Sequence, residues 1–310
     1  MKDIFISAVI PIFNEEENLP VLTEKLTRVL SQYAKYEIIY INDGSKDNSE
    51  RLISDYCKKN SSIKLINLSR NFGHQQAITA GLNYANGDAV VIMDGDLQDP
   101  PEVIPEFVDK WQEGYDVVYA IRTKRKENIF KKLAYFIFYR FLNKISDVKI
   151  PLDSGDFSIL DKEIVNQLNL LPEKNRFVRG IRAWLGFKQI GIEYERDARN
   201  AGKPKYTFKK LLQLALDGIL SFSHKPLIIA THLGMIITFI SFISILVVIY
   251  LKLFTTITVV GYASYMTVML FMGGIQLFMI GILGEYIGRI YDEVKNRPNY
   301  IVNKTQNIEM

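Results

Sequence analysis

Strand-like apolar runs and amphipathic helical patterns alternate along the first 120 residues of the chain. The predicted strands span 6–13, 37–42, 63–68, 89–93 and 116–120. The predicted helices, in which apolar residues recur at helical spacing, span 19–31, 47–59, 75–84 and 103–113. Strands that alternate with helices of about 10 to 15 residues are typical of a mostly parallel sheet covered by helices, so we expect an α/β fold.

Two later stretches are long and without charge. Residues 227–251 contain no Asp, Glu, Lys or Arg over 25 positions, and residues 253–284 contain none over 32. About 20 helical residues cross the hydrocarbon core of a bilayer, so each stretch is long enough to span it. The alternative, a pair of buried core helices, rarely combines this length with so little polar content. We therefore predict a transmembrane hairpin at 226–290, with spans at about 227–251 and 259–284.

Basic residues flank the hairpin on both sides, whereas Lys252 is the only charged residue between its spans. The flanking residues are Lys205, Lys209, Lys210, Lys225, Arg289, Lys295 and Arg297. The positive-inside rule then places the domain 1–225 and the tail 291–310 in the cytoplasm, in a multi-pass protein of the plasma (inner) membrane. Pro11 interrupts an N-terminal apolar run that is too short for a signal peptide, so this run is expected to be a strand.

Two stretches rich in basic and aromatic residues predict further contact with the membrane. They lie at about 129–146 and 208–223. Basic amphipathic helices of this kind lie in the plane of the lipid headgroups. The first is expected to contact the membrane, while the second could equally pack on the domain core. Arg179 and Arg182 are expected to belong to an interfacial helix as well.

Composition limits the remaining classes of function. The chain has 310 residues and a formal net charge of +4, which fits a membrane-surface protein and does not indicate nucleic acid as a partner. Cys57 is the only cysteine. An intrachain disulfide and a cysteine-built metal site are therefore excluded.

The densest candidate chemistry follows the fourth predicted strand. Asp94, Asp96 and Asp99 come within six positions, directly after an apolar run and before two prolines. A buried parallel strand that ends here would place these acids in the crevice where such sheets bind ligands. Mg²⁺ and Mn²⁺ take carboxylate ligands and complete their octahedron with water and substrate phosphates. The pattern predicts a site for a divalent cation and a diphosphate, although paired aspartates also occur in ordinary turns.

Motifs spread over nearly the whole chain fit one family. They are Pro11-Ile12-Phe13-Asn14-Glu15, Asn42-Asp43-Gly44-Ser45, Arg70-Asn71-Phe72-Gly73-His74-Gln75, Asp94-Gly95-Asp96-Leu97-Gln98 and Ser154-Gly155-Asp156-Phe157. Together with the hairpin, they resemble the family 2 glycosyltransferases of GT-A fold, in particular the polyprenyl-phosphate glycosyltransferases. These include bactoprenol glucosyltransferases and dolichol-phosphate mannose synthases. The resemblance implies a Rossmann-like GT-A catalytic domain followed by a two-helix transmembrane hairpin.

The resemblance also implies a role for each matching position. Contacts with a nucleotide-sugar are implied for Pro11, Phe13, Glu15, Asp43, Asp94, Gly95, Arg199 and Lys205. Metal ligation is implied for Asp94, Asp96 and Gln98, all oxygen donors suited to Mg²⁺ or Mn²⁺. Catalytic roles are implied for Asp96, Arg122 and Asp156. From the residues alone, Asp43 could instead cap the next helix or stabilise its own turn.

The implied reaction is the inverting transfer of a single sugar to a polyprenyl phosphate. UDP-glucose is the expected donor and undecaprenyl phosphate the expected acceptor, at the cytoplasmic membrane face, for modification of cell-envelope glycans. A phosphate monoester is mostly dianionic at neutral pH, because its second pKa is about 6. Asp156 is therefore a base or, as we prefer, an orienting group, and Arg122 is the best candidate to compensate the acceptor charge. A homo-oligomer, by resemblance a tetramer, is also expected.

Three positions depart from the family pattern. Asn42 stands where the first of two paired aspartates is usual, and Ser158 replaces an arginine common in the bacterial branch, which removes one possible phosphate contact. Pro204 stands where serine is usual and stiffens the basic loop.

Two other functions remain open. A processive polysaccharide synthase would require a Gln-x-x-Arg-Trp motif and more spans, and the sequence contains no such motif. A non-catalytic membrane scaffold that retains the fold would require none of the site residues, yet these are intact at Asp94, Asp96, Gln98, Arg199 and Lys205.

Overall fold

One eight-stranded sheet forms the core of the protein in a computed structural model that describes residues 2–123, 154–174, 176–195, 223, 225–254 and 261–308. Its strands are β1 (Lys2–Ile12), β2 (Tyr33–Asn42), β3 (Ile63–Leu68), β4 (Ala89–Ile92), β5 (Val117–Thr123), β6 (Ser154–Asp161), β7 (Gln189–Glu195) and β8 (Val302–Gln306). Their order across the sheet is β7-β5-β6-β4-β1-β2-β3-β8. β1, β2, β3 and β4 pair in parallel, as do β5 and β7, so the sheet is mixed but mostly parallel.

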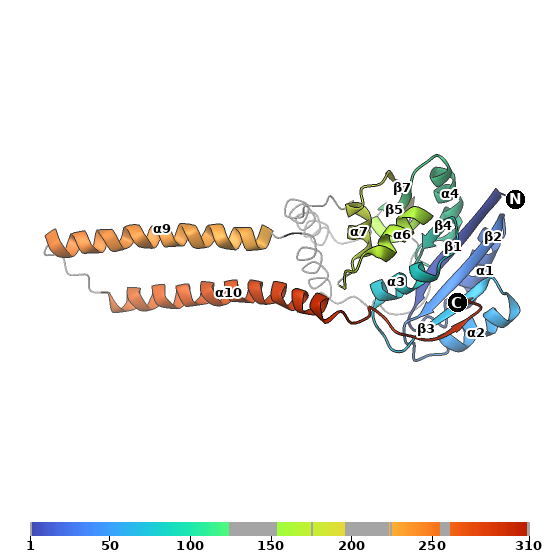
Figure 1. The fold of residues 1–310 in the computed structure, drawn as a ribbon, viewed down its shortest axis with the longest axis horizontal. Helices are drawn as coiled ribbons and strands as arrows, with labels where there is room; N and C mark the ends of the chain where they lie inside the picture. The colour runs from blue at the N-terminus through green and yellow to red at the C-terminus, as the bar shows by residue number, and fades with distance from the viewer. Residues whose placement is uncertain are drawn as a thin grey trace.

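Helices cover both faces of this sheet (Figure 1). They are α1 (Leu19–Leu30), α2 (Ser49–Lys59), α3 (His74–Tyr84), α4 (Ile104–Gln112, preceded by a 3₁₀ turn), α6 (Lys162–Leu170) and α7 (Val178–Trp184). Apolar side chains of α1, α2 and α4 share one hydrophobic cluster, and those of α3, α6 and α7 share the other. Because both faces are buried, β4 is a continuous apolar run, and β1 is apolar from Ile4 onward except at Ser7. Each strand and helix predicted within residues 6–120 is present, most of them with ends shifted by a few residues.

The antiparallel strand β6 lies between β4 and β5 and was not predicted. In its pairing with β4, Ile92 lies opposite Ser158. The same register, continued by two residues, brings Asp94 at the end of β4 level with Asp156 near the start of β6. Because β6 runs antiparallel, its first residues lie at the edge of the sheet where the parallel strands end.

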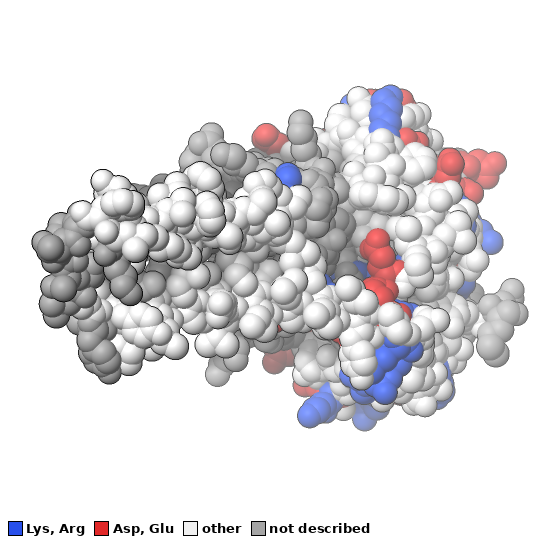
Figure 2. Space-filling model, turned by 60° about the vertical axis from the view of Figure 1, so that its left-hand side comes forward, with Lys and Arg blue, Asp and Glu red and all other residues white. Residues whose placement is uncertain are grey.

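Two long apolar helices, α9 (Lys225–Phe254) and α10 (Tyr262–Lys295), extend side by side from the globular part (Figure 1). Their most apolar stretches have mean hydropathies of 2.6 and 2.0, and no residue of either stretch is buried. Lys, Arg, Asp and Glu gather on the globular part, while the visible face of the helices is almost free of them (Figure 2). α10 continues beyond the predicted end of the second span. The expected interfacial helices at 129–146 and 208–223 lie outside the described residues.

After α10 the chain returns to the eight-stranded sheet. β8 pairs antiparallel with β3, so the expected separate tail in fact forms the edge of the sheet. Asn83 donates a hydrogen bond to the Tyr300 hydroxyl (2.7 Å), which fixes the segment before β8 on the domain. Because β8 and β1 belong to one sheet, a hairpin that crosses a membrane must begin and end on the same side of it.

Asn307 holds the end of β8 in place, and its replacement tests the contribution of this strand. Its Nδ2 donates to the backbone oxygens of Cys57 (2.7 Å) and Ile63 (2.9 Å). We expect Asn307→Ala to lower the free energy of unfolding by about 1–2 kcal/mol, because two carbonyl oxygens lose their donor. Chemical denaturation in detergent measures this loss. Asn303→Ala, an exposed position on the same strand, should change little, and equal losses for both variants would contradict the assignment.

Candidate active site

Polar groups collect where the parallel strands of the sheet end. Glu15 follows β1, Asp43 follows β2 and Asp94 follows β4, as predicted from the sequence. Pro11 and Phe13 lie at the end of β1, and Pro11 pairs with Ile41 of β2. The Glu15 carboxylate accepts a hydrogen bond from Asn18 Nδ2 (2.7 Å), while its backbone N–H donates to Ser49 Oγ (3.1 Å). One edge of the sheet therefore carries most of the predicted site.

A tight turn after β4 brings the three predicted metal ligands together. A Cβ added to Gly95 would lie 2.5 Å from Ile12 Cδ1, so a larger residue would have to displace the Ile12 side chain for the turn to lie this close to β1. Leu97 adopts a left-handed conformation with φ of 59°, and Asp96 Oδ1 accepts a hydrogen bond from the Gln98 N–H (3.2 Å). Left-handed backbone is unfavourable for leucine, so the surrounding packing must impose it. Asp94, Asp96 and Gln98 consequently share one short, constrained turn.

His74 connects this turn to β6. Its Nε2 lies 2.8 Å from Asp94 Oδ1, and its Nδ1 lies 3.8 Å from Asp156 Oδ2. Burial lowers the pKa of the imidazole, but the charges of the two carboxylates and the hydrogen bond to Asp94 outweigh it and raise the pKa to about 9. The sequence alone predicts that His74 is a structural or capping residue, whereas the structure adds it to the site as a cation. The available signal was its position at the start of α3, in the segment that follows β3, the neighbour of β2 in the sheet.

Arg179 forms a two-point ion pair with Asp156. Its Nε donates to Oδ1 (2.7 Å) and its Nη2 donates to Oδ2 (3.1 Å), while Gln75 Nε2 donates to Oδ2 (3.3 Å). Burial raises the pKa of the Asp156 carboxyl, but the guanidinium and His74 outweigh it and hold that pKa below its usual range. Asp156 is therefore a fixed anion whose oxygens are already occupied by donors.

The expectation of an interfacial helix for Arg179 and Arg182 was wrong. α7 packs against the sheet, with Val178 and Ile181 in the same cluster as α3 and α6. Phe177 and Trp184 beside the two arginines gave the helix the composition of a membrane-surface segment. Arg179 is consequently a residue of the site that the sequence interpretation missed.

Asp43 and Asn42 organise the loops around the edge. Asp43 accepts hydrogen bonds from the backbone N–H groups of Phe72 (2.7 Å) and Gly73 (2.9 Å), which lead into α3. Burial, opposed by these bonds, raises the pKa of its carboxyl. Asn42 Nδ2 donates to Asn67 Oδ1 (2.9 Å), and its Oδ1 accepts from the Ser45 N–H (3.1 Å). An aspartate at position 42 could not donate this hydrogen bond, which gives the departure from the paired-aspartate pattern a physical reason.

The donor set at the β4 turn fits a hard divalent cation. Asp94, Asp96 and Gln98 offer carboxylate and amide oxygens, the ligands that Mg²⁺ and Mn²⁺ prefer. Within the described ranges, no group of three or more His, Cys, Asp and Glu side chains is placed to hold a metal. Two carboxylates and one amide suit a cation that takes its other ligands from water and a bound diphosphate.

The other predicted residues are placed only in part. The backbone of Arg122 lies in β5, pairs with Tyr194 of β7 and reaches the same edge, but its side chain is outside the described part of the structure. Arg199 and Lys205 also lie outside the described residues.

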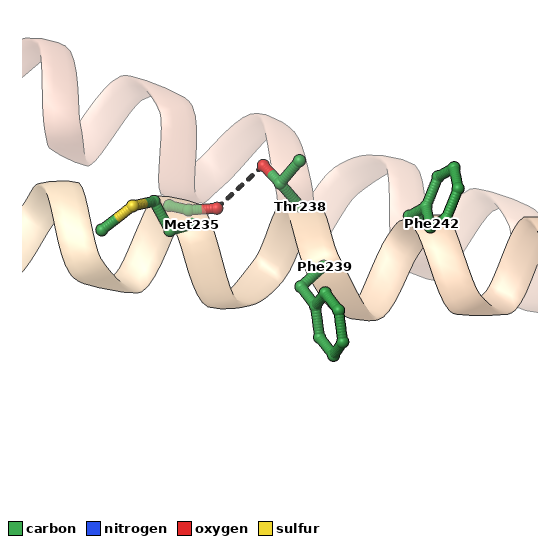
Figure 3. Close-up of a pocket in the computed structure, with 5 residues that line it drawn as sticks. Met235, Thr238, Phe239 and Phe242 are labelled. Carbon is green, nitrogen blue, oxygen red and sulfur yellow. Dashed lines mark hydrogen bonds between the residues drawn. The ribbon is translucent and has the colours of Figure 1, made fainter.

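A separate apolar pocket lies on α9, away from the charged edge. Figure 3 shows Met235, Thr238, Phe239 and Phe242 on this one helix, and Gly234 completes the lining. The Thr238 hydroxyl donates to the Gly234 backbone oxygen (2.9 Å), so the pocket's side-chain polar group is already used. The charged side chains described above lie at the edge of the sheet instead.

Two family models match separate parts of the chain. Residues 7–168, which include the β4 turn and Asp156, match the model described as Glycosyl transferase family 2. Residues 225–290, which include α9 and most of α10, match the model described as the GtrB C-terminal hairpin.

Relatives match the chain over nearly its full length. The chain is 49% identical to the uncharacterised glycosyltransferase YkcC of Bacillus subtilis, over 98% of this chain and 94% of the relative. It is 45% identical to the SfII prophage-derived bactoprenol glucosyl transferase of Shigella flexneri, over 97% and 98% of the two chains. Among solved structures, glucosyl-3-phosphoglycerate synthase from Mycobacterium tuberculosis, in complex with Mn²⁺, UDP and phosphoglyceric acid, is 20% identical, covers 74% of this chain and 78% of its own, and has a TM-score of 0.48.

Proposed function

Because the chain belongs to glycosyl transferase family 2 and carries the GtrB C-terminal hairpin, we propose that it transfers one glucose from UDP-glucose to a polyprenyl phosphate. The observation that carries this proposal is the 45% identity, over nearly the full length, to a bactoprenol glucosyl transferase. The chain combines a charged sheet edge, which suits a polar donor, with an apolar hairpin, which suits a lipid acceptor. This combination supports the proposal, because the reaction requires both substrates in one place.

The proposed reaction is a single displacement with inversion. An oxygen of the acceptor phosphate bonds to the anomeric carbon of glucose, while the bond from that carbon to the β-phosphate oxygen of UDP breaks. A divalent cation held by Asp94, Asp96 and Gln98 would supply Lewis-acid stabilisation of the departing diphosphate. The residues proposed to contact the nucleotide and sugar are Pro11, Phe13, Glu15, Asp43 and Gly95. The cations proposed to lie beside the phosphates are Arg199 and Lys205.

Asp156 is proposed to orient the site without accepting a proton. The acceptor phosphate is mostly dianionic at neutral pH and needs little deprotonation. The two-point pair with Arg179 supports this role, because a carboxylate with a lowered pKa and occupied oxygens is a weak base. Arg122, at the end of β5, remains the proposed partner of the acceptor on the membrane side.

The hairpin is proposed to anchor the enzyme in the plasma (inner) membrane, with the domain 1–225 and both termini in the cytoplasm. The basic flanks of the hairpin support this orientation. A reporter fused after Met310 should be active in the cytoplasm, and a periplasmic or extracellular signal would contradict the orientation. Assembly as a homo-tetramer and a role in envelope glycan modification are part of the same proposal.

A turnover assay with purified protein tests the proposed function. Radiolabelled nucleotide-sugars and undecaprenyl phosphate are supplied in detergent, and the lipid product is separated by chromatography. Transfer of a single glucose from UDP-glucose is expected. Long glycan chains would indicate a processive synthase, and no turnover with any sugar nucleotide would favour a scaffold.

A further inference from the structure

Arg182 is a buried cation that the proposed reaction has not used. Its side chain is 1% exposed, and within the described residues its Nε and Nη2 have no hydrogen-bond partner. Its guanidinium lies over the ring of Tyr119, 5.1 Å from the ring centroid. Burial lowers its pKa to about 10, so it remains charged at neutral pH. A charged group without hydrogen bonds is costly to bury, and such a group calls for an anion that completes it.

The surroundings of Arg182 belong to the active site. Tyr119 of β5 lies opposite Ser158 of β6, so their side chains share one face of the sheet. Asp156 lies two residues before Ser158 on the same strand and therefore projects to that face as well. Asp156 is already paired with Arg179, and its charge reaches Arg182 only at longer range. α7 thus contributes two guanidinium groups to a face where β6 offers one carboxylate.

Position 158 indicates what the second guanidinium is for. Ser158 is neutral and fully buried, and its hydroxyl donates to the Asp156 backbone oxygen (2.9 Å). It therefore supplies neither a positive charge nor a free donor. An arginine at position 158, which the resemblance implies there, would project from β6 to the face of the sheet that α7 covers. In this chain Arg182 of α7, and no side chain at position 158, supplies a second cation on that face.

We propose that Arg182 binds the phosphate of the polyprenyl-phosphate acceptor, replacing from α7 the cation that Ser158 lacks. The acceptor phosphate, settled beside Asp156, supplies the oxygens that Nε and Nη2 are without. A guanidinium suits this task because it binds phosphate through parallel hydrogen bonds. The inference rests on the proposed function, since it names the residue that meets the acceptor.

Arg182→Leu separates binding from structure. Loss of a charged hydrogen bond should raise the KM for undecaprenyl phosphate about 10- to 100-fold, while the KM for UDP-glucose stays unchanged. The melting temperature should not fall, because the variant removes an unsatisfied buried charge. Arg182→Lys should recover part of the affinity. An unchanged KM for the lipid in folded Arg182→Leu would overturn the proposal.

A positional exchange is the sharper test. Adding Ser158→Arg to Arg182→Leu returns the guanidinium to β6, and the double variant should regain most of the lipid affinity lost by the single one. Arg176→Leu is the matched control, because Arg176 Nη2 donates to the backbone oxygens of Leu168 (2.5 Å) and Leu171 (2.6 Å). It should lower stability without changing the KM for the lipid. A folded double variant that binds lipid no better than Arg182→Leu would contradict the exchange.

Binding measurements keep the two proposals distinguishable. Titration of undecaprenyl phosphate into full-length protein in nanodiscs gives a Kd that needs no turnover. One outcome is that the wild type binds undecaprenyl phosphate more tightly than Arg182→Leu does but transfers no glucose. This result would refute the proposed function and support the phosphate site. Transfer by the wild type with equal lipid Kd in both proteins would refute the phosphate site alone.

Discussion

Asp96→Ala is expected to lower kcat about 10²- to 10³-fold, the loss typical of removing one electrostatic stabiliser from a transition state. Asp96 lies in the constrained turn after β4, and its proposed role is to hold the cation beside the departing diphosphate. Removal of divalent cations by EDTA should abolish transfer by the wild type, and Mg²⁺ or Mn²⁺ should restore it. Initial rates with saturating UDP-glucose and lipid phosphate measure both effects.

Asp96→Asn is the matched control for the structure of the turn. Its amide oxygen can still accept the hydrogen bond from the Gln98 N–H, so the turn should remain intact while the charge is lost. We expect wild-type thermal stability with activity close to that of the alanine variant. Full wild-type activity in EDTA would remove Asp94, Asp96 and Gln98 from any metal-binding role.

Arg179→Ala is expected to cost about 3–5 kcal/mol of folding free energy, because it leaves the buried Asp156 carboxylate without its two-point partner. In the wild type, the lowered pKa of Asp156 stabilises the folded state at pH values above the pKa that this carboxyl has in the unfolded chain. This stabilisation is lost as the pH falls through the pKa of Asp156 in the folded protein. Without the guanidinium, burial dominates and the pKa should rise above its ordinary value. The dependence of stability on pH then has the opposite sign. The variant should lose stability as the pH rises from the pKa of Asp156 in the unfolded chain towards its higher pKa in the folded protein.

Denaturant titrations across the acidic and neutral range measure this reversal. The double variant Asp156→Asn/Arg179→Ala is the control, because it has no carboxylate to titrate at this position. It should lose less stability than the sum of the single variants, as expected for a coupled pair. Additive losses would mean that the two side chains do not interact in solution.

The sequence predicted the parallel part of the sheet well, because two signals identify each strand there: an apolar run and the turn-forming residues that follow it. β3 was predicted at its observed bounds, since an apolar run is followed directly by turn-forming residues. The strands β6 and β8 carry no such information. A strand buried on both faces gives no sign of its direction, and the short polar edge strand β8 resembles a loop.

The candidate site divides in the same way. Asp94 and Asp96 were found because their spacing is local, on one turn of the chain. Arg179 was not found, because its partner Asp156 is 23 residues away and only the fold brings them together. His74 was passed over for a similar reason, since its two carboxylates come from different strands.

The return of the chain to β3 ties folding of the domain to insertion in the bilayer. While the ribosome is still synthesising the hairpin, the N-terminal domain must wait with β3 as an open edge, a form of sheet that invites pairing with other chains. Translation at about 5–20 residues per second makes this wait several seconds or more for the residues between β7 and β8. A nascent chain whose hairpin crosses the membrane only once would leave β8 on the wrong side, with the sheet unfinished. If the hairpin crosses the bilayer, the sheet is therefore completed by β8 only when both ends of the hairpin lie on the same side.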